Sequence, residues 1–555
     1  MPLRPARTLI AAVAVLAACG TLPDRTARAP VLEGFGTLDW RLPGVDTAAQ
    51  QAFTRGVLQA YAFNEKEAVR QFKAALALDP RCAMCAWGVA WQLGPNINNP
   101  SRSGSEEALR YVGLALRLAD RATPRERALI DALAVRYGHA SQIRDTAPLL
   151  ERCGPTGDAP HPLDVAYAAR LRVLADAWPD DADVTSLYAE AELIATDGDW
   201  WDAKTGEPGG RVGDVALRLE HALVLQPAHT GLNHYLIHAT DADGVAPRAL
   251  AAADRLGALA PASPHLVHMP SHTYGRVGRF ADAVRVNEKA VDADLVLAQV
   301  QKAQGFEPSH DWRSHNQHFL WYAALMEGRG DLALATARDS ASRARPANGY
   351  RRALPVLALL RLERWQAVLD EPPPSSEERG MGLVLVAHAR GIAAARLGRL
   401  DDARAALPRA EEGAAQVAKA FAGNGDNERA LRDLAASAVA RLAAEVALAE
   451  GRVDDALARQ VDATRLQAAA DDFEPPMLAA GGAVALGDLQ RRAGRWADAE
   501  RSFRERLALQ PHDGWALDGL VRTLRAAGRN AEADALRPRL DAAWARADAA
   551  LRQRS

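Results

Sequence analysis

The sequence predicts an all-α solenoid of stacked helical hairpins. Its helical stretches are rich in Ala and Leu, and no run of alternating β-branched residues predicts a strand. A spacing of 34 residues recurs, from Pro227 to Pro261 and from Gly244 to Gly278. The chain has 555 residues, which exceeds the usual size of a single hydrophobic core. A repeat architecture that grows by stacking accommodates this length.

One pattern of small and large side chains occurs in four segments. In the first segment, Ala68, Phe72, Ala75 and Pro80 follow one another at spacings of four, three and five residues. The other three segments are Val215, Leu219, Ala222, Pro227; Ala249, Ala253, Leu256, Pro261; and Ala499, Phe503, Arg506, Pro511. The pattern resembles that of tetratricopeptide (TPR) repeats. This resemblance implies a TPR-like α-solenoid, a right-handed superhelix whose hairpins line a concave groove with their first helices.

The chain divides into five predicted parts. Residues 1–18 form a signal peptide, and residues 19–44, mixed in Pro, Gly, Thr and Arg, form a tether. Residues 45–370 form an N-terminal TPR-like array that contains most of the histidines. A Pro-rich linker at 371–380 separates it from a C-terminal TPR array at 381–555.

Helices of the first array are expected in order along the chain. The first repeat spans residues 47–80. Further helical stretches cover 105–122, 124–137, 163–178 and 185–196. Turn residues, mainly Gly, Pro and Asn, separate these stretches.

The N-terminus resembles a bacterial lipoprotein signal. Arg4 and Arg7 precede an apolar run that ends at Ala18 and is shorter than the roughly 20 residues that span a bilayer. Cys19 follows it as the lipidated Cys follows a lipobox, and lipidation would anchor the chain to a membrane. The alternative is a plain cleaved signal with a chance Cys. The resemblance implies an exported, periplasm-facing lipoprotein, at the outer membrane if the source is Gram-negative.

Charge gives no case for nucleic acid binding. The net charge is −3, and charged residues of both signs, 25% of the chain, are interspersed. The partners expected are the membrane, through the N-terminal lipid, and a protein on the C-terminal TPR array, since most TPR arrays bind proteins.

Nine of the 14 histidines lie between residues 229 and 328, and seven of them recur in register. Their positions are counted back from three turn glycines, Gly244, Gly278 and Gly328. Histidines stand thirteen residues before a turn glycine (His265, His315), ten before (His234, His268, His318) and six before (His238, His272). Offsets that differ by three and four lie on one face of a helix. The TPR resemblance places this face in the concave groove.

The recurring histidines predict a transition metal site. The expected ligands are His234, His238, His268, His272 and His318, with Asp241, His265 and His315 as weaker candidates. Packed helices lie about 8–10 Å apart, so imidazoles from adjacent helices can converge on one ion. Two histidines with Asp241 fit iron, whereas an all-histidine set suits copper or zinc. An open coordination position would make the ion catalytic, with no reaction named by any motif.

Polar residues beside the histidines are expected to support the site or line the groove: Asn233, Arg276, Asn287, Asn316 and Tyr322. Asn287 occupies the repeat position of Phe72, where a buried amide needs a polar partner. Three alternatives stand beside the metal hypothesis. The histidines could fill a polar groove through hydrogen bonds, or form an anion or cofactor site with Arg276, Arg279 and Arg313. The chain could also be a protein-interaction scaffold without metal or catalysis.

Cys82 and Cys85 form a C-x-x-C pair. In an exported protein this pair is a disulfide, a thiol redox pair or half of a metal site. It is not a haem attachment motif, because Ala86 follows where His is required. The pair, together with the string H-M-P-S-H at His268 to His272, resembles a subset of bacterial TPR proteins, a resemblance that implies no particular activity.

Overall fold

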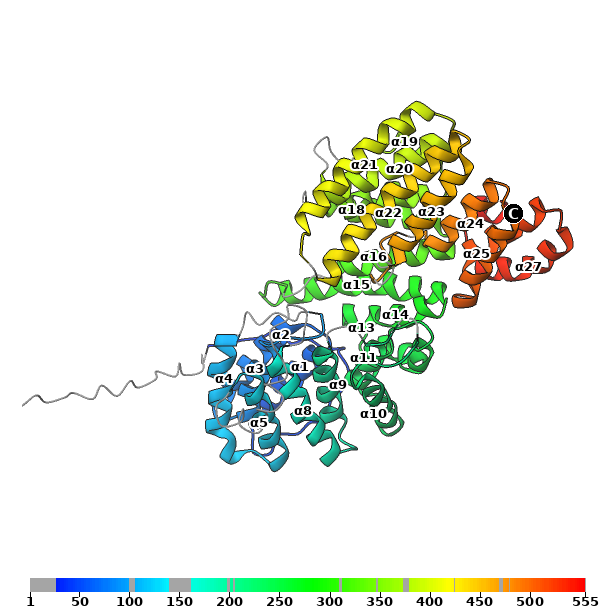
Figure 1. Ribbon diagram of the computed structural model, residues 1–555. Coiled ribbons are helices and arrows are strands. Elements are labelled where there is room, and N and C mark those ends of the chain that lie inside the picture. Colours follow the sequence, from blue (N-terminus) through cyan, green and yellow to red (C-terminus); the bar gives the residue numbers. More distant parts are fainter. Residues whose placement is uncertain are drawn as a thin grey trace, which may run out of the picture.

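Helices make up the ordered backbone of this computed structural model. The structure describes residues 26–98, 105–138, 161–196, 200–202, 205–308, 312–345, 348–372, 379–423, 425–468, 473–478 and 480–554. Within these ranges no strand occurs; an isolated bridge joins Trp201 and Pro208. Consecutive helices pack against each other along the chain, so the prediction of an all-α, TPR-like solenoid is confirmed (Figure 1). No helix in the same ranges is both long and apolar enough to cross a membrane.

The helices of the N-terminal end, blue to cyan in Figure 1, are α1 (Thr47–Tyr61), α2 (Glu65–Leu78), α3 (Ala83–Gln92), α4 (Ser105–Leu118), η1 (Ala119–Arg121), α5 (Pro124–Arg136), α8 (Pro162–Ala177) and α9 (Ala182–Ala195). The middle of the chain contains α10 (Val212–Leu225), α11 (Thr230–Ala239), η3 (Ala246–Ala249), α12 (Leu250–Leu259), α13 (Pro264–His268), α14 (Pro270–Arg276), α15 (Phe280–Ala303), α16 (Arg313–Glu327), α17 (Gly330–Arg343), α18 (Gly349–Arg361) and α19 (Trp365–Asp370). The C-terminal part contains α20 (Gly380–Arg396), α21 (Leu400–Ala420), α22 (Asp426–Ala449), α23 (Val453–Ala468), α24 (Gly482–Arg492), α25 (Trp496–Leu509), α26 (Gly514–Ala526), α27 (Asn530–Ala543) and α28 (Ala549–Arg552).

The large residue of the TPR pattern packs against glycines of two neighbouring helices. A Cβ on Gly56 of α1 or on Gly88 of α3 would lie only 2.6 or 2.5 Å from the Phe72 ring of α2. The same arrangement recurs near the other end of the chain, where Phe503 lies against Gly487 and Gly519. Close backbone approach around a buried ring therefore sets the spacing between stacked hairpins.

Turns inside the hairpins use the left-handed backbone region. Gly244, Gly278 and Gly328 have φ values of 77° to 78°, which glycine adopts without steric cost. In the first repeat Phe63, five residues before Ala68, occupies this turn position with φ 48°. A phenylalanine there is strained, and strained residues are retained where the surrounding structure requires their side chain.

The described part of the predicted tether is packed on the array. Leu32, Phe35, Trp40 and Leu42 are buried, and Ala262 N donates to Gly34 O at 2.9 Å. Four apolar side chains in this short segment explain the difference from a free tether. The predicted signal peptide, Cys19 and the start of the tether lie outside the described residues.

The C-terminal end of the chain returns to the histidine-rich helices. Trp515 Nε1 of α26 donates to Leu325 O of α16 at 2.8 Å, and Asp548 N donates to Gly328 O at 3.0 Å. The linker residues 373–378 lie outside the described residues, and α20 beyond them packs on α18 and α19. A domain boundary at 371–380 stays a prediction.

Candidate metal centres

Six of the predicted histidines form two groups of three. We call His234, His238 and His265 set A, and His268, His272 and His315 set B. In each set, one repeat supplies the residues ten and six before its turn glycine, and the next repeat supplies the residue thirteen before its own glycine. Set B is therefore set A displaced by one repeat. His265 and His315, expected as weaker candidates, complete the two groups.

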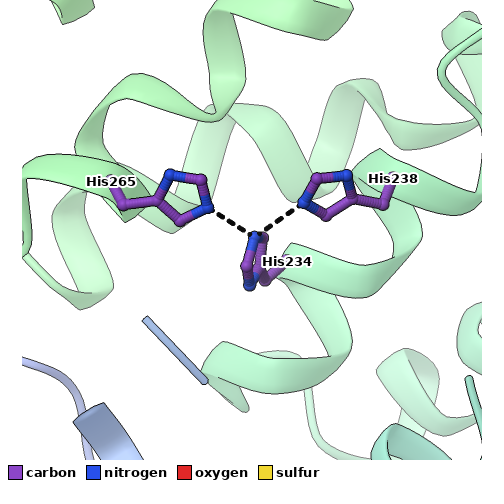
Figure 2. A group of neighbouring side chains, drawn as sticks. All are labelled: His234, His238 and His265. Atoms are coloured by element: carbon purple, nitrogen blue, oxygen red, sulfur yellow. Dashed lines mark hydrogen bonds between the residues drawn. The ribbon is translucent and has the colours of Figure 1, made fainter. Parts of the chain in front are cut away.

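In set A, three imidazole Nε2 atoms point toward one another (Figure 2). His234 Nε2 lies 3.0 Å from His238 Nε2 and 3.1 Å from His265 Nε2. His234 Nδ1 lies 2.7 Å from Tyr61 O. Because α1 ends at Tyr61, this carbonyl lacks a helical partner and is available to accept.

The contact with Tyr61 fixes the tautomer of His234. A carbonyl oxygen only accepts, so His234 Nδ1 carries the proton and Nε2 carries a lone pair in the neutral ring. Burial lowers the pKa of His234 to about 3, so the ring is neutral at pH 7. Burial, followed by neighbouring histidines, lowers the pKa of His238 and of His265 well below 6.5. Two neutral rings therefore approach a single lone pair, which cannot accept two well-aligned hydrogen bonds.

Set B repeats this geometry with a different fixing partner. His268 Nε2 lies 3.1 Å from both His272 Nε2 and His315 Nε2. His268 Nδ1 donates to Asn287 Oδ1 at 2.7 Å, and Asn287 Nδ2 donates to Ala283 O at 2.8 Å, which orients the amide. Burial lowers the pKa of His268 well below 6.5. The predicted need of Asn287 for a polar partner is met by His268.

Among the described residues, carboxylates contact set B and not set A. His272 Nδ1 lies 2.7 Å from Asp241 Oδ2 and 2.8 Å from Glu474 Oε2. Arg276 pairs with the same two carboxylates, at 3.1 Å and 2.8 Å. Burial lowers the pKa of His272, but Glu474 and Asp241 outweigh it and raise the pKa to about 10. Asp241 therefore orients a set B histidine and does not complete a two-histidine, one-carboxylate group with His234 and His238.

Each set is covered by one phenylalanine. The Phe63 ring centroid lies 4.5, 5.2 and 5.5 Å from the ring centroids of set A. The Phe319 ring centroid lies 4.5, 4.6 and 5.0 Å from those of set B. Trp312 also stacks on His265 with centroids 4.3 Å apart. These rings explain why the histidines are largely buried and do not line an open groove.

The nitrogen spacings match those around a bound ion. Metal to imidazole nitrogen distances of about 2.0–2.1 Å in a tetrahedral site place neighbouring nitrogens about 3.3 Å apart. The spacings to the central histidine are 3.0 to 3.1 Å in both sets. His265 Nδ1 is buried and has no hydrogen-bond partner among the described residues. Small movements of the outer rings bring either set to coordination distance.

His318 lies outside both sets. Its Nε2 lies 2.6 Å from Tyr350 Oη, which also donates to Met477 O at 2.9 Å. Tyr350 stands thirteen residues before Glu363, which holds the left-handed turn position with φ 54°. The repeat pattern thus continues to a third place, where Tyr322 and Tyr350 replace two histidines.

The other predicted polar residues lie apart from the imidazole nitrogens. Asn233 Nδ2 donates to Pro227 O and His229 O. Asn316 is fully buried, and neither of its amide atoms has a partner within the described ranges. Arg276, Arg279 and Arg313 are paired with aspartates or Glu474, which leaves little positive charge for an anion at the histidines.

Cys82 and Cys85 form a disulfide at the start of α3, and Cys82 Sγ accepts from Cys85 N. Of the three predicted states for this pair, the structure shows the disulfide. The pair is remote in sequence from both sets and belongs to none of the groups placed to hold an ion in the described chain.

Asn287 provides a test of the fixing contact in set B. Asn287→Leu restores the apolar residue of the TPR pattern but removes the shorter of two polar contacts of His268 Nδ1, and only Ser271 Oγ, at 3.2 Å, remains. We expect metal affinity at set B to fall about 10–100-fold, the usual effect of losing such a partner. Calorimetric titration measures both sets in one experiment, and set A is the internal control. Equal affinities of variant and parent at set B contradict the role of Asn287.

Phe63 provides a test of the strained cover. Phe63→Gly removes a buried ring, which costs about 3–5 kcal/mol, and releases about 1–2 kcal/mol of left-handed strain. The free energy of unfolding should therefore fall by about 1–4 kcal/mol in denaturant titration. Phe319→Ala, in a helix without that strain, is the matched control and should lose the larger amount. A Phe63→Gly loss that equals or exceeds the Phe319→Ala loss contradicts the strain argument.

Comparison with known proteins finds similarity of this chain to solved structures only. No family model and no curated protein matches the chain. Human IFIT1, solved as a dimer with m7Gppp-AAAA, is similar over 87% of this chain and 94% of its own, with 12% identity and a TM-score of 0.33. A chain of the APC/C hetero-tetramer Cut9-Hcn1 is similar over 91% of this chain and 95% of its own, with 14% identity and a TM-score of 0.24. At these TM-scores the likeness carries no argument about function.

Proposed function

We propose that this chain is a TPR-type metal-binding protein in which set A and set B each hold one transition metal ion. The supporting observation is the convergence of three buried Nε2 atoms in each set. The central ring presents a lone pair to both neighbours, an arrangement that a cation satisfies and hydrogen bonds do not. The recurrence of the same constellation one repeat later argues against chance packing.

Copper or zinc fits these ligands better than iron. Both sets consist of imidazoles alone, and such sets suit zinc and copper. The carboxylate that an iron site would use, Asp241, is engaged by His272 and Arg276. Asp241 contacts the Nδ1 atom of a histidine that would bind the ion through Nε2. A carboxylate in this position orients the imidazole and raises its basicity as a ligand.

Set B is the better candidate for chemistry. Three protein ligands leave one position of a tetrahedral ion open, as in catalytic sites. A cavity of about 70 Å³ lies beside it, lined by His272, Arg276, Tyr322 and Glu474 among others. This is the volume of about two water molecules. The cavity adjoins the side of His272 whose Nδ1 contacts Asp241 and Glu474, and a small polar ligand there would lie next to Arg276 and Tyr322. No residue pattern names a reaction.

Metal analysis of the purified chain tests the proposal directly. We expect two ions per chain after exchange into copper or zinc and removal of free metal, measured by elemental analysis. The protein concentration is fixed by amino-acid analysis, and chelator-treated protein should take up the same number on titration. A chain that contains no stoichiometric metal and takes up none contradicts the proposal.

Export and lipidation belong to the same proposal. We infer from the lipobox-like residues that Cys19 carries a lipid and holds the protein at a periplasm-facing membrane. Metabolic labelling with a radioactive fatty acid should mark the parent chain, and Cys19→Ser should abolish the label and release the chain from the membrane fraction. Equal labelling of the two chains contradicts lipidation at this residue.

Protein binding is the second candidate function. The C-terminal array has the stacked hairpins that TPR proteins use for it, and a partner there stays a prediction. Capture experiments with the whole chain test it. Loss of a partner through surface changes on α20 to α27, with metal content unchanged, would separate this function from the metal sites.

A further inference from the structure

A second cavity, within the C-terminal part of the chain, is lined by an unusual number of cations. It lies among α18, α20, α22, α24 and α26 and has a volume of about 70 Å³. Its lining includes five arginines against three carboxylates, and it shares no residue with set A or set B. The excess of positive charge in this partly enclosed cavity raises the question of which arginines form ion pairs.

Three of the five arginines are paired. Arg396 lies 2.7 Å from Asp488, and this pair is part of a larger network of carboxylates and arginines. Arg522 and Arg554 lie 3.5 Å and 3.8 Å from Asp518. These contacts engage the carboxylates that line the cavity.

Arg361 and Arg441 remain without an ion pair or a hydrogen bond within the described part of the chain. The Arg361 guanidinium stacks on the Trp515 ring at 4.1 Å, and its Nε and Nη2 atoms are buried without a partner. Burial lowers the pKa of Arg361 to about 10; the charge of Asp513 acts against this shift, and the positive charge of Arg441 adds to it. A stacked guanidinium is fixed in orientation and presents its donors along the ring edge, the geometry that recognises planar or tetrahedral oxyanions.

His388 adds an acceptor to the same cavity. It is fully buried, its Nδ1 donates to Ala438 O at 2.8 Å, and its Nε2 has no partner among the described residues. Burial and Arg441 lower the pKa of His388 to about 3. The ring is therefore neutral at pH 7, and the lone pair on Nε2 can accept a hydrogen bond.

We propose that this cavity binds a small oxyanion that carries a hydroxyl group, such as hydrogenphosphate or a short hydroxycarboxylate. The anionic oxygens accept from Arg361 and Arg441, and the hydroxyl donates to His388 Nε2. Two guanidinium groups without a direct ion pair in a partly enclosed cavity are unfavourable for folding, because a desolvated charge needs a partner. The volume, about that of two water molecules, admits an anion of four or five heavy atoms and excludes a nucleotide.

Calorimetric titration of the whole chain tests the proposal, with four anions at constant ionic strength in chloride. Phosphate and sulfate differ by the hydroxyl, as do glycolate and acetate. We expect one saturable site, with phosphate bound at least tenfold more tightly than sulfate, and glycolate more tightly than acetate. The stronger of the phosphate and glycolate responses identifies the class of ligand. No saturable binding of any of the four anions, or equal binding within both pairs, overturns the proposal.

Three variants separate binding from folding. Arg441→Met should abolish anion binding and raise the melting temperature in chloride alone, because it removes a desolvated charge that makes no direct ion pair among the described residues, although Glu445 and Asp488 lie near it. His388→Leu should retain binding but lose the preference for phosphate over sulfate. Arg465→Met, at an exposed arginine of α23, should change neither property. Anion binding retained by Arg441→Met, or a lower melting temperature of this variant in chloride, overturns the proposal.

Discussion

Replacing the central histidine of either set should remove one of the two metal ions and leave the other. His234→Gln is expected to empty set A, and His268→Gln to empty set B. Each central ring makes both short Nε2 contacts of its set, so its loss leaves two ligands at most. The loss in affinity should exceed the roughly 10–100-fold that follows removal of a supporting partner. The double variant should bind no metal, as measured by elemental analysis.

Glutamine is chosen because both rings are fully buried, so alanine would leave a cavity in addition to removing a ligand. The glutamine amide keeps a donor for the acceptors that fix His234 and His268. His221→Gln, at an exposed histidine of α10, is the matched control and should retain both ions. His318→Gln should also retain both, since Tyr350 already engages its ring. Two ions in either central variant, with helical circular dichroism unchanged, would contradict the assignment.

The repeat register predicted most of the residues of the candidate metal centres. Counting back from the three turn glycines identifies seven histidines at equivalent positions, and six of them form the two sets. Fold class follows from the same periodicity, because stacked hairpins repeat both their packing residues and their turns. The grouping was not visible in one helix, since each set takes its third ligand from the next repeat.

The repeat register could not predict contacts between residues that are far apart in the sequence and meet across the stacked repeats. Glu474 follows the residue it pairs with, Arg276, by 198 positions, and Tyr61 precedes His234 by 173. Such pairings depend on how a solenoid returns on itself, which no local pattern encodes. Phe63 had a local signal, because a non-glycine residue stands at the turn position five residues before Ala68. Its contact with three histidines nevertheless needed the structure.

Acid should destabilise the metal-free chain steeply between pH 6.5 and 5. Burial is the first cause that lowers the pKa of seven described histidines, to about 3 where a value is resolved: His234, His238, His265, His268, His315, His318 and His388. In the unfolded chain their pKa is about 6.5. Below that pH the unfolded chain binds more protons, so the free energy of unfolding falls as the pH falls. Each histidine contributes a slope of up to about 1.4 kcal/mol per pH unit.

His272 acts differently from these seven histidines, and so do carboxyl groups whose pKa burial raises, among them Glu190, Glu65, Glu192 and Glu474. His272 has a pKa raised to about 10, so its stabilisation is complete below pH 6.5 and is lost only as the pH rises through 10. Burial raises the pKa of Glu190 to about 7, so Glu190 stabilises the fold as the pH falls and offsets about one histidine. Urea unfolding of chelator-treated protein at pH 6.5, 6 and 5 measures the slope. His318→Gln should make the slope shallower by about one proton. A free energy of unfolding that stays flat over this range would mean that the seven histidines take up protons inside the fold. The argument that the rings of set A, and His268 and His315 of set B, are neutral and ready to bind metal would then fail.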